Sequence, residues 1–208
     1  MSKLKPTLYY VHDPMCSWCW GFRAVWIQVN EVVKDQVNIQ TVLGGLAPDS
    51  SQTMTELMQQ NIQSNWRRIQ QEIPGTEFNY DFWHNCEPRR STYPACRAVI
   101  AAGMQAEHYK KMMILAIQQA YYLHAKNPSD HSVLIQLAKD SGLDEKCFER
   151  DLLSDECKNL FNKELQLTAR LNVNSFPNLV LNHRNVNTEI HVDYNSAETV
   201  VSEIVALI

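Results

Sequence analysis

Residues 13–19 read Asp13-Pro14-Met15-Cys16-Ser17-Trp18-Cys19 and place two thiols two residues apart. The β-branched and aromatic run over residues 7–11 predicts a strand before them, and apolar residues at three- and four-residue spacing up to Val33 predict a helix after them. Cys16 is therefore expected in the first turn of that helix, with Cys19 one turn further in on its inward stripe. Free backbone N–H groups and the positive end of the helix dipole favour the Cys16 thiolate there. The pattern predicts a redox dithiol in which Cys16 attacks and Cys19 resolves.

Composition limits the class of protein. The chain has 208 residues, of which 45% are hydrophobic, enough for one enlarged domain or two. A net charge of −4 provides no basic field for nucleic acid, and no apolar run approaches the roughly 18 residues needed to span a membrane. The opening from Met1 to Pro6 lacks the pattern of a secretory signal, which predicts a cytoplasmic protein, and a monomer is expected. Six cysteines in a reducing compartment indicate thiols, ligands or catalysts rather than a disulfide framework.

The chain after the first helix predicts a βαβ unit and then a helical block. Residues 37–43 alternate as a second strand that stops at Gly44-Gly45. The short connection requires a right-handed crossover, so the two strands are expected to be parallel. From about Pro48 helical spacing replaces alternation, and no strand is expected up to residue 153. The predicted helices of this block span residues 53–72, 93–124 with a break near 103–107, 131–141 and 144–153.

The last third predicts a return to the sheet. A helix over residues 155–171 is followed by two strands, 178–181 and 188–193, which are expected to form an antiparallel hairpin around a polar turn. A final helix starts at Asn195 or Ser196. The predicted fold is α/β, a mixed sheet flanked by helices with an all-helical insertion. We divide it into a first sheet part (1–47), the insertion (48–153) and a second sheet part (154–208).

Two motifs carry a resemblance to a known family. The run Tyr9-Tyr10-Val11-His12-Asp13-Pro14-Met15-Cys16-Ser17-Trp18-Cys19-Trp20-Gly21-Phe22 resembles the DsbA-like thiol-disulfide oxidoreductases, most closely their FrnE-like, predicted protein-disulfide-isomerase branch. Residues 174–181 resemble the cis-proline loop of that family. The resemblance implies a thioredoxin-like fold. It also implies that Phe176 and Pro177 face the active disulfide and an extended substrate, while Trp18 between the cysteines is the tryptophan expected to be exposed to substrate.

The motif also departs from the family pattern. Ser17 and Trp18 stand where strongly oxidising members have a Pro-His pair, and Tyr10 stands where thioredoxin-like relatives often have a buried carboxylate. His12 and Asp13 are the nearest candidates for proton handling, although Asp13 before a proline is equally typical of a turn. These departures leave the reduction potential and the physiological direction open.

Other residues have two interpretations each. A CxxC can be half of a zinc site, but no second CxxC or close His pair supplies further ligands, so no metal is predicted. Cys86 and Cys96 are either a second redox pair or, as we prefer, two separate thiols. The aromatic residues of 78–93 either line a substrate groove or, for most of them, pack the insertion against the sheet. The pairs Arg67-Arg68 and Arg89-Arg90 indicate solvated faces rather than anion sites.

Three functions remain. The main hypothesis is a disulfide oxidoreductase or isomerase that acts on protein or small-molecule disulfides, with no cofactor beyond its dithiol and glutathione as a candidate co-substrate. A second is a glutathione-dependent transferase or isomerase of the kappa or hydroxychromene-carboxylate type. Those relatives keep a serine or a single thiol at the place of Cys16, and the presence of Cys19 argues against them. A third is a non-catalytic binding module that uses the dithiol as a redox sensor. The recycling partner is not identified by any motif.

Overall fold

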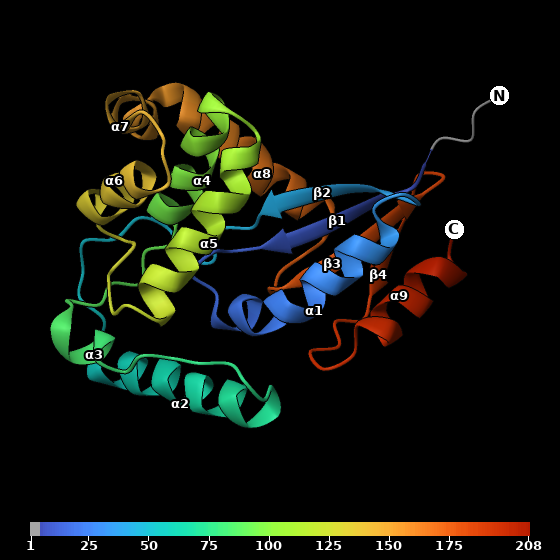
Figure 1. Cartoon of the computed structure of the whole chain (residues 1–208), viewed down its shortest axis with the longest axis horizontal. Helices are drawn as coiled ribbons and strands as arrows, with labels where there is room; N and C mark the ends of the chain where they lie inside the picture. Colours follow the sequence, from blue (N-terminus) through green and yellow to red (C-terminus); the bar gives the residue numbers. More distant parts are fainter. Residues whose placement is uncertain (1–4) are drawn as a thin grey trace.

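The computed structural model describes residues 5–208. Residues 1–4, part of the segment on which the cytoplasmic prediction depends, lie outside this range. The centre of the molecule is a four-stranded sheet in the order β2-β1-β3-β4 (Figure 1). Its strands are β1 (Thr7–His12), β2 (Asn38–Leu43), β3 (Asn178–His183) and β4 (Val186–Ile190). β1 and β2 are parallel as predicted, and the pairs β1–β3 and β3–β4 are antiparallel.

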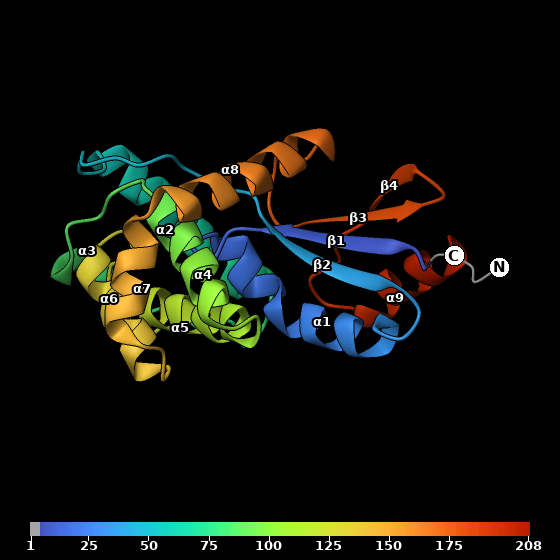
Figure 2. The same cartoon turned by 90° about the horizontal axis from the view of Figure 1, so that it is seen from above.

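Helices cover both faces of the sheet. Figure 2 shows α1 (Ser17–Val33) and α9 (Ala197–Ala206) on one face and α8 (Asp155–Arg170) on the other. The alternation of β1 explains this layering, because Leu8 and Tyr10 pack toward α1 and α9 while Val11 packs into the opposite cluster. The predicted mixed sheet flanked by helices, with a helical insertion, is confirmed.

The insertion forms the part of the molecule beyond the carboxyl ends of β1 and β2 (Figure 1). Its helices are α2 (Glu56–Glu72), α3 (Phe82–Asn85), α4 (Tyr93–Gln105), α5 (His108–Tyr122), α6 (His131–Asp140) and α7 (Glu145–Leu153). The predicted break between two helices occurs at Ala106, whose backbone is extended. Only the four-residue α3 is a helix that the pattern did not predict. The domain boundaries at 47/48 and 153/154 stay a prediction.

Local caps explain where the helices begin. The Thr55 side chain accepts a hydrogen bond from the backbone N–H of Met58, so α2 starts at Glu56 rather than at the predicted residue 53. Pro94 lies in the first turn of α4, as predicted. Within residues 5–208, no helix is both long and apolar enough to cross a membrane.

The hairpin starts earlier than predicted. Arg184 and Asn185 both have positive φ, 54° and 65°, which is the backbone of a two-residue type I′ turn. The pairing of β3 with β4 therefore begins with His183 opposite Val186 rather than at residue 188. β4 ends at Ile190 instead of 193, because the next backbone N–H, of His191, bonds the side chain of Glu203 on α9.

Candidate functional site

Cys16 lies at the N-terminus of α1, one residue before the first helical residue and so one residue from its predicted position. Its backbone is extended, and the residue is only 6% exposed. The Cys16 thiol donates a hydrogen bond to the backbone carbonyl of Phe176 at 3.5 Å. The first N–H groups of a helix have no partner within the helix and favour negative charge in front of them. The sulfur of Cys16 therefore lies at the positive end of the α1 dipole.

Cys19 lies one turn further into α1 and is completely buried. Burial raises the pKa of the Cys19 thiol well above its usual value, and a hydrogen bond with the Cys16 thiol adds to the rise. The backbone N–H of Asp13 donates to the Cys19 sulfur and acts in the opposite direction. The two thiols are thus in contact but differ in environment. Cys19 lies deeper in the protein than Cys16, and the Cys19 thiol is protonated at neutral pH.

Asp13 is a buried carboxyl in the turn between β1 and α1. Its Oδ1 accepts the backbone N–H of Met15 at 2.7 Å, which makes it the turn residue that its place before a proline indicates. Its Oδ2 accepts the Leu46 N–H at 2.7 Å, the Thr92 hydroxyl at 2.6 Å and the Cys96 thiol at 3.5 Å. Burial raises the pKa of Asp13, while these four donors lower it. Asp13 therefore connects the dithiol turn to the loop after β2 and to the start of α4.

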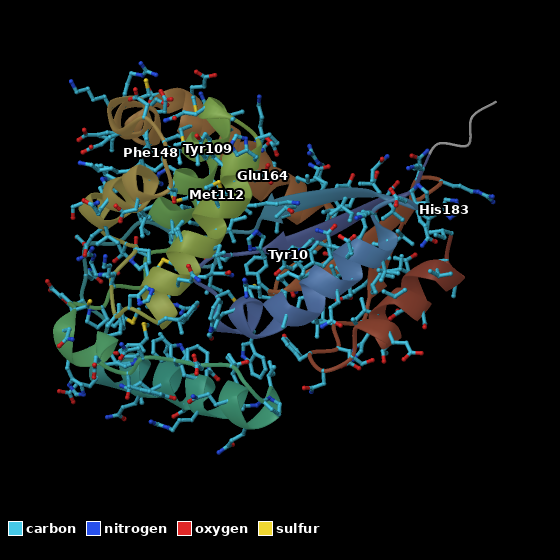
Figure 3. All side chains as sticks on the ribbon, viewed as in Figure 1. Tyr10, Tyr109, Met112, Phe148, Glu164 and His183 are labelled. Atoms are coloured by element: carbon cyan, nitrogen blue, oxygen red, sulfur yellow. The ribbon has the colours of Figure 1, made fainter. Side chains whose placement is uncertain are left out.

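Tyr10 lies near the two thiols, and His12 is stacked on it. Tyr10 lies on β1 and faces α1 (Figure 3), in the place of the carboxylate that relatives often have. Burial and the two nearby thiols raise the pKa of Tyr10, so it stays protonated. The His12 ring is stacked on the Tyr10 ring with centroids 4.8 Å apart, and neither His12 ring nitrogen has a hydrogen-bond partner within residues 5–208. Burial lowers the pKa of His12 to about 4, so its imidazole is neutral at pH 7.

The loop before β3 carries the other predicted contacts. The Phe176–Pro177 peptide bond is cis, and Pro177 is buried. The Phe176 ring lies against Gly44 at the end of β2, where a Cβ would come within 2.0 Å of the ring. Gly44 therefore provides the space in which Phe176 holds its carbonyl in front of Cys16.

Trp18 and Trp20 are half-buried rather than exposed. The Trp18 ring packs against Tyr194 at 5.1 Å, and the guanidinium of Arg68 lies 5.1 Å above it. Trp20 stacks on Tyr122 at 5.7 Å, and its indole N–H donates to a backbone carbonyl of the insertion. Both tryptophans of the motif therefore attach the start of α1 to neighbouring segments. Trp18, predicted to be the exposed tryptophan of the motif, is half-buried, and its role in binding substrate stays a prediction.

The other four cysteines are free thiols that lie in different surroundings. The Cys86 thiol donates to the Ala125 carbonyl at 3.1 Å, whereas Cys96 is fully buried against Asp13. This arrangement is that of two separate thiols. Cys157 is buried on α8, and Cys147 is half-buried on α7. Within residues 5–208, no group of three or more His, Cys, Asp or Glu side chains is arranged to hold a metal ion.

A cavity of about 310 Å³ opens beside Cys16. The sheet part contributes its lining from Met15 to Trp18 and from Asn174 to Phe176. The insertion contributes the opposite side, with Met54, Ile62, Asn65, Trp66, Arg89, Arg90, Thr92 and Tyr121. Its volume is within the range of small-molecule sites, about 300–1,000 Å³.

Sequence reasoning missed the insertion side of this cavity. Arg89 and Arg90, expected on a solvated face, both line it, and Arg89 forms an ion pair with Asp130. Trp66 is completely buried at the centre of the aromatic cluster, where most of the aromatic residues of 78–93 pack around it rather than against the sheet. No spacing rule connects these residues to Cys16, so no pattern in the sequence indicated them.

Comparison with known proteins places the chain in a family. A protein-family model described as thioredoxin matches residues 9–201. The chain belongs to this thioredoxin family. A crystal structure of a candidate protein disulfide isomerase from Nitrosomonas europaea has a TM-score of 0.83 at 27% identity and covers 97% of each chain. The predicted relationship to DsbA-like oxidoreductases is confirmed, and this thioredoxin-family fold supports disulfide oxidoreductase activity in general.

Two further relatives differ in their described roles. The cytosolic disulfide reductase DsbM from Pseudomonas aeruginosa has a TM-score of 0.71 at 23% identity, over 89% of each chain, and shares the fold. The ClpXP adapter protein SpxH from Halalkalibacterium halodurans is 24% identical over 193 residues, which are 90% of this thioredoxin-family chain. The chain spans about three fifths of the length of the SpxH proteins that it matches.

Proposed function

We propose that this protein is a thiol-disulfide oxidoreductase or isomerase in which Cys16 attacks the substrate disulfide and Cys19 resolves the intermediate. One observation carries the proposal. Cys16 stands at the N-terminus of α1 on the wall of a cavity, and the buried Cys19 contacts it from behind. This is the geometry that a dithiol needs to receive a substrate on one sulfur and close with the other.

In the first step, the Cys16 thiolate attacks one sulfur of a substrate disulfide. A bond forms between the Cys16 sulfur and that substrate sulfur, the substrate S–S bond breaks, and the second substrate sulfur leaves as a thiolate. Phe176 and Pro177 border the site of attack, since the Phe176 carbonyl lies 3.5 Å from the Cys16 sulfur. When a substrate sulfur takes that position, the carbonyl and the neighbouring Trp18 are the groups it meets.

In the second step, Cys19 loses its proton and attacks the Cys16 sulfur. The Cys16–Cys19 disulfide forms, the mixed disulfide breaks, and the substrate leaves as a second thiolate, so the substrate gains the two electrons that the dithiol loses. Asp13 is our candidate proton acceptor. Its backbone contacts the Cys19 sulfur, and burial raises the pKa of its carboxyl, which makes the carboxylate a stronger base. His12 is the weaker candidate because its ring makes no hydrogen bond within the described residues.

The reverse sequence would oxidise a substrate dithiol, and a cycle without net electron transfer would isomerise a protein. A reducing setting fits the six free cysteines, so we place the activity in the cytoplasm with glutathione as the recycling thiol and the protein as a monomer. A second solved structure of DsbM, described as a cytosolic disulfide reductase, is with GSH. That relative supports glutathione as the first co-substrate to test.

The test is a glutathione redox titration with acid quenching, alkylation and mass mapping of each cysteine. We expect Cys16 and Cys19 to interconvert as a pair, and the midpoint potential then indicates the direction. Cys19→Ser should accumulate a mixed disulfide on Cys16, whereas Cys16→Ser should form none. Cys147→Ser is the matched control, since this half-buried thiol on α7 should leave the titration unchanged.

If Cys16 and Cys19 stay reduced and unpaired across the whole titration, the dithiol mechanism is wrong. If a mixed disulfide forms on Cys16 in the wild type and is never released by Cys19, the resolving role of Cys19 is wrong. A glutathione-dependent transferase would then become the better explanation, because it needs no second thiol.

The match to SpxH supports a second candidate, a protein-binding adapter. SpxH proteins are described as ClpXP adapters and match 83–90% of this chain. An adapter would bind a protein to be delivered to ClpXP, with or without redox turnover. The Cys16→Ser/Cys19→Ser double variant separates the two functions, because an adapter should keep its protein-binding affinity whereas an oxidoreductase should lose all turnover.

A further inference from the structure

The cavity beside Cys16 has an uneven charge distribution. The residues that line it include Arg89 and Arg90 and, within residues 5–208, no aspartate or glutamate. The whole chain, by contrast, carries a net charge of −4. A substrate that enters this cavity therefore meets positive charge on the wall of the same cavity that Cys16 lines, against the sign of the molecule as a whole.

The two arginines are not equivalent. Arg89 is half-buried, and its guanidinium is paired with the carboxylate of Asp130. Arg90 is exposed, and no carboxylate in the described part of the chain lies within 4.0 Å of its guanidinium. Arg89 is already neutralised within the protein, so Arg90 is the cation that remains available to a ligand.

A neighbouring residue locates the Arg90 charge at the cavity. Tyr121 of α5 is buried and lines the same cavity. Burial raises the pKa of Tyr121, and the charge of Arg90 acts on it in the opposite direction. Arg90 is exposed and lines the cavity together with Tyr121, so its charge lies on the cavity wall and is accessible to a ligand.

We infer that this cavity selects small disulfides that carry a carboxylate near the sulfur, and that Arg90 pairs with that carboxylate. This inference rests on the proposed function of Cys16. A guanidinium binds a carboxylate through two parallel N–H donors, so it positions the substrate as well as attracting it. The volume of about 310 Å³ suits a molecule of a few residues rather than a folded domain.

The chemistry of the selected step is unchanged. The Cys16 thiolate displaces one carboxylate-bearing thiolate, and Cys19 displaces the other. One disulfide therefore yields two thiolates and one Cys16–Cys19 disulfide. Arg90 takes no part in bond formation, and its contribution is to bind the substrate and hold its sulfur toward Cys16.

The test uses pre-reduced protein and three disulfides of similar size. Dithiodipropionate carries two carboxylates, hydroxyethyl disulfide is neutral, and cystamine carries two ammonium groups. The second-order rate of Cys16–Cys19 oxidation is measured with each by alkylation and mass mapping. Each rate is divided by the rate at which dithiothreitol reduces the same disulfide. This normalisation removes differences in the intrinsic reactivity of the three disulfides. The normalised rate should be about tenfold higher for dithiodipropionate than for hydroxyethyl disulfide, as a charge-assisted contact of ordinary strength provides.

Two variants of Arg90 sharpen the test. In Arg90→Gln the normalised rate with dithiodipropionate should fall to about the rate with the neutral hydroxyethyl disulfide, so that their ratio is about one. Arg90→Glu should reverse the preference, so that cystamine becomes the faster substrate. Arg67→Gln is the matched control, since it makes the same charge change on an exposed arginine of α2 that does not line the cavity. The preference of this control should equal that of the wild type.

Each outcome has a distinct meaning. If the wild type oxidises with hydroxyethyl disulfide but shows no preference for dithiodipropionate, the inference is wrong and the proposed function stands. An equal loss of preference in Arg67→Gln would also overturn it, because long-range charge alone would then explain the effect. If none of the three disulfides oxidises the dithiol, the proposed function itself fails.

Discussion

The cavity has two sides that are built in different ways. The reactive wall, residues 15–18 and 174–176, carries the sulfur and the carbonyl in front of it. The insertion wall, formed by Met54, Ile62, Trp66, Arg89, Arg90 and Tyr121, carries the aromatic packing and the positive charge. The Cys16 thiol of the reactive wall and its partner Cys19 come from one short segment, whereas the insertion wall is assembled from α2, two loops and α5. Reactivity is therefore encoded locally in this protein, and recognition depends on how the insertion packs.

The largest effect should come from breaking the insertion wall. Trp66 is completely buried and contacts the rings of Phe78, Tyr80, Phe82, Trp83, Tyr121 and Tyr122. Trp66→Ala should lower the free energy of unfolding by about 3–5 kcal/mol, measured by urea titration. Trp26→Ala on α1 is the control, since Trp26 is only half-buried and should cost less. Equal losses in the two variants would contradict the central role of Trp66.

The stability of the protein should depend on pH through His12. The pKa of His12 falls from its usual 6.5 to about 4 on folding. Between these values the unfolded chain binds a proton that the folded protein does not, so stability is lost as the pH falls from 6.5 toward 4. The loss from His12 is on the order of 3 kcal/mol. His12→Phe should remove this part of the pH dependence, measured as the unfolding free energy at several pH values.

Asp13 has the opposite effect on the pH dependence of stability. Its pKa is raised on folding, so the stability that Asp13 contributes is lost as the pH rises above the usual pKa of an aspartate. The quantity to compare is therefore the difference between His12→Phe and the wild type, in which Asp13 cancels. His84→Phe, on the exposed His84 of α3, is the control and should keep the wild-type pH dependence. A parallel pH profile for His12→Phe and the wild type would show that the His12 assignment is wrong.

A smaller effect is expected at the support of the Phe176 loop. In Gly44→Ala the new methyl group would lie 2.0 Å from the Phe176 ring, so the ring and its carbonyl must move away from Cys16. We expect the oxidation rate with hydroxyethyl disulfide to fall on the order of tenfold. In a Phe176→Ala background the same Gly44→Ala change should have little further effect, because the ring is gone. Equal effects in both backgrounds would mean that Gly44 acts by another route.

The smallest effect should come from increasing the positive charge of the insertion wall. Asp130→Asn removes the carboxylate that pairs with Arg89 and leaves a second free guanidinium at the cavity. The preference for dithiodipropionate over hydroxyethyl disulfide should rise by about twofold, since exposed ion pairs contribute little. Asp49→Asn makes the same charge change in the Asp49–Arg97 pair, whose residues do not line the cavity, and is the control. An unchanged preference in Asp130→Asn would show that Arg89 does not reach the substrate.

Much of the fold could be predicted from local patterns. The parallel pair of β1 and β2, the break at Ala106 and the hairpin all follow from alternation, helical spacing and turn residues. The errors are local as well. β4 starts earlier than predicted because Arg184 and Asn185 form a type I′ turn. Two consecutive non-glycine residues with positive φ are not obvious from composition. The four-residue α3 is too short to show a period.

The site was predictable only on its reactive side. Cys16 and Cys19 lie within one residue of their predicted positions in α1. The contacts of Asp13 with Thr92 and Cys96, 79 and 83 residues away, were not indicated by any pattern. The placement of Arg90 in the same cavity as Cys16 was missed for the same reason. An Arg-Arg pair in a loop has the composition of a solvated surface until the folded chain brings it to a cavity.

The sequence by itself determined that this protein carries two thiols in one helical turn at the end of a strand. A spacing of three residues in a helix brings side chains together whatever the rest of the chain does. Only the tertiary structure decided what surrounds those thiols, namely the Phe176 carbonyl at Cys16, the contacts of the nearby Asp13 carboxyl with Thr92 and Cys96, and the Arg90 charge in the same cavity. These contacts join segments far apart in the chain, and packing distributed over the whole insertion holds them in place, so no single stretch of residues encodes them.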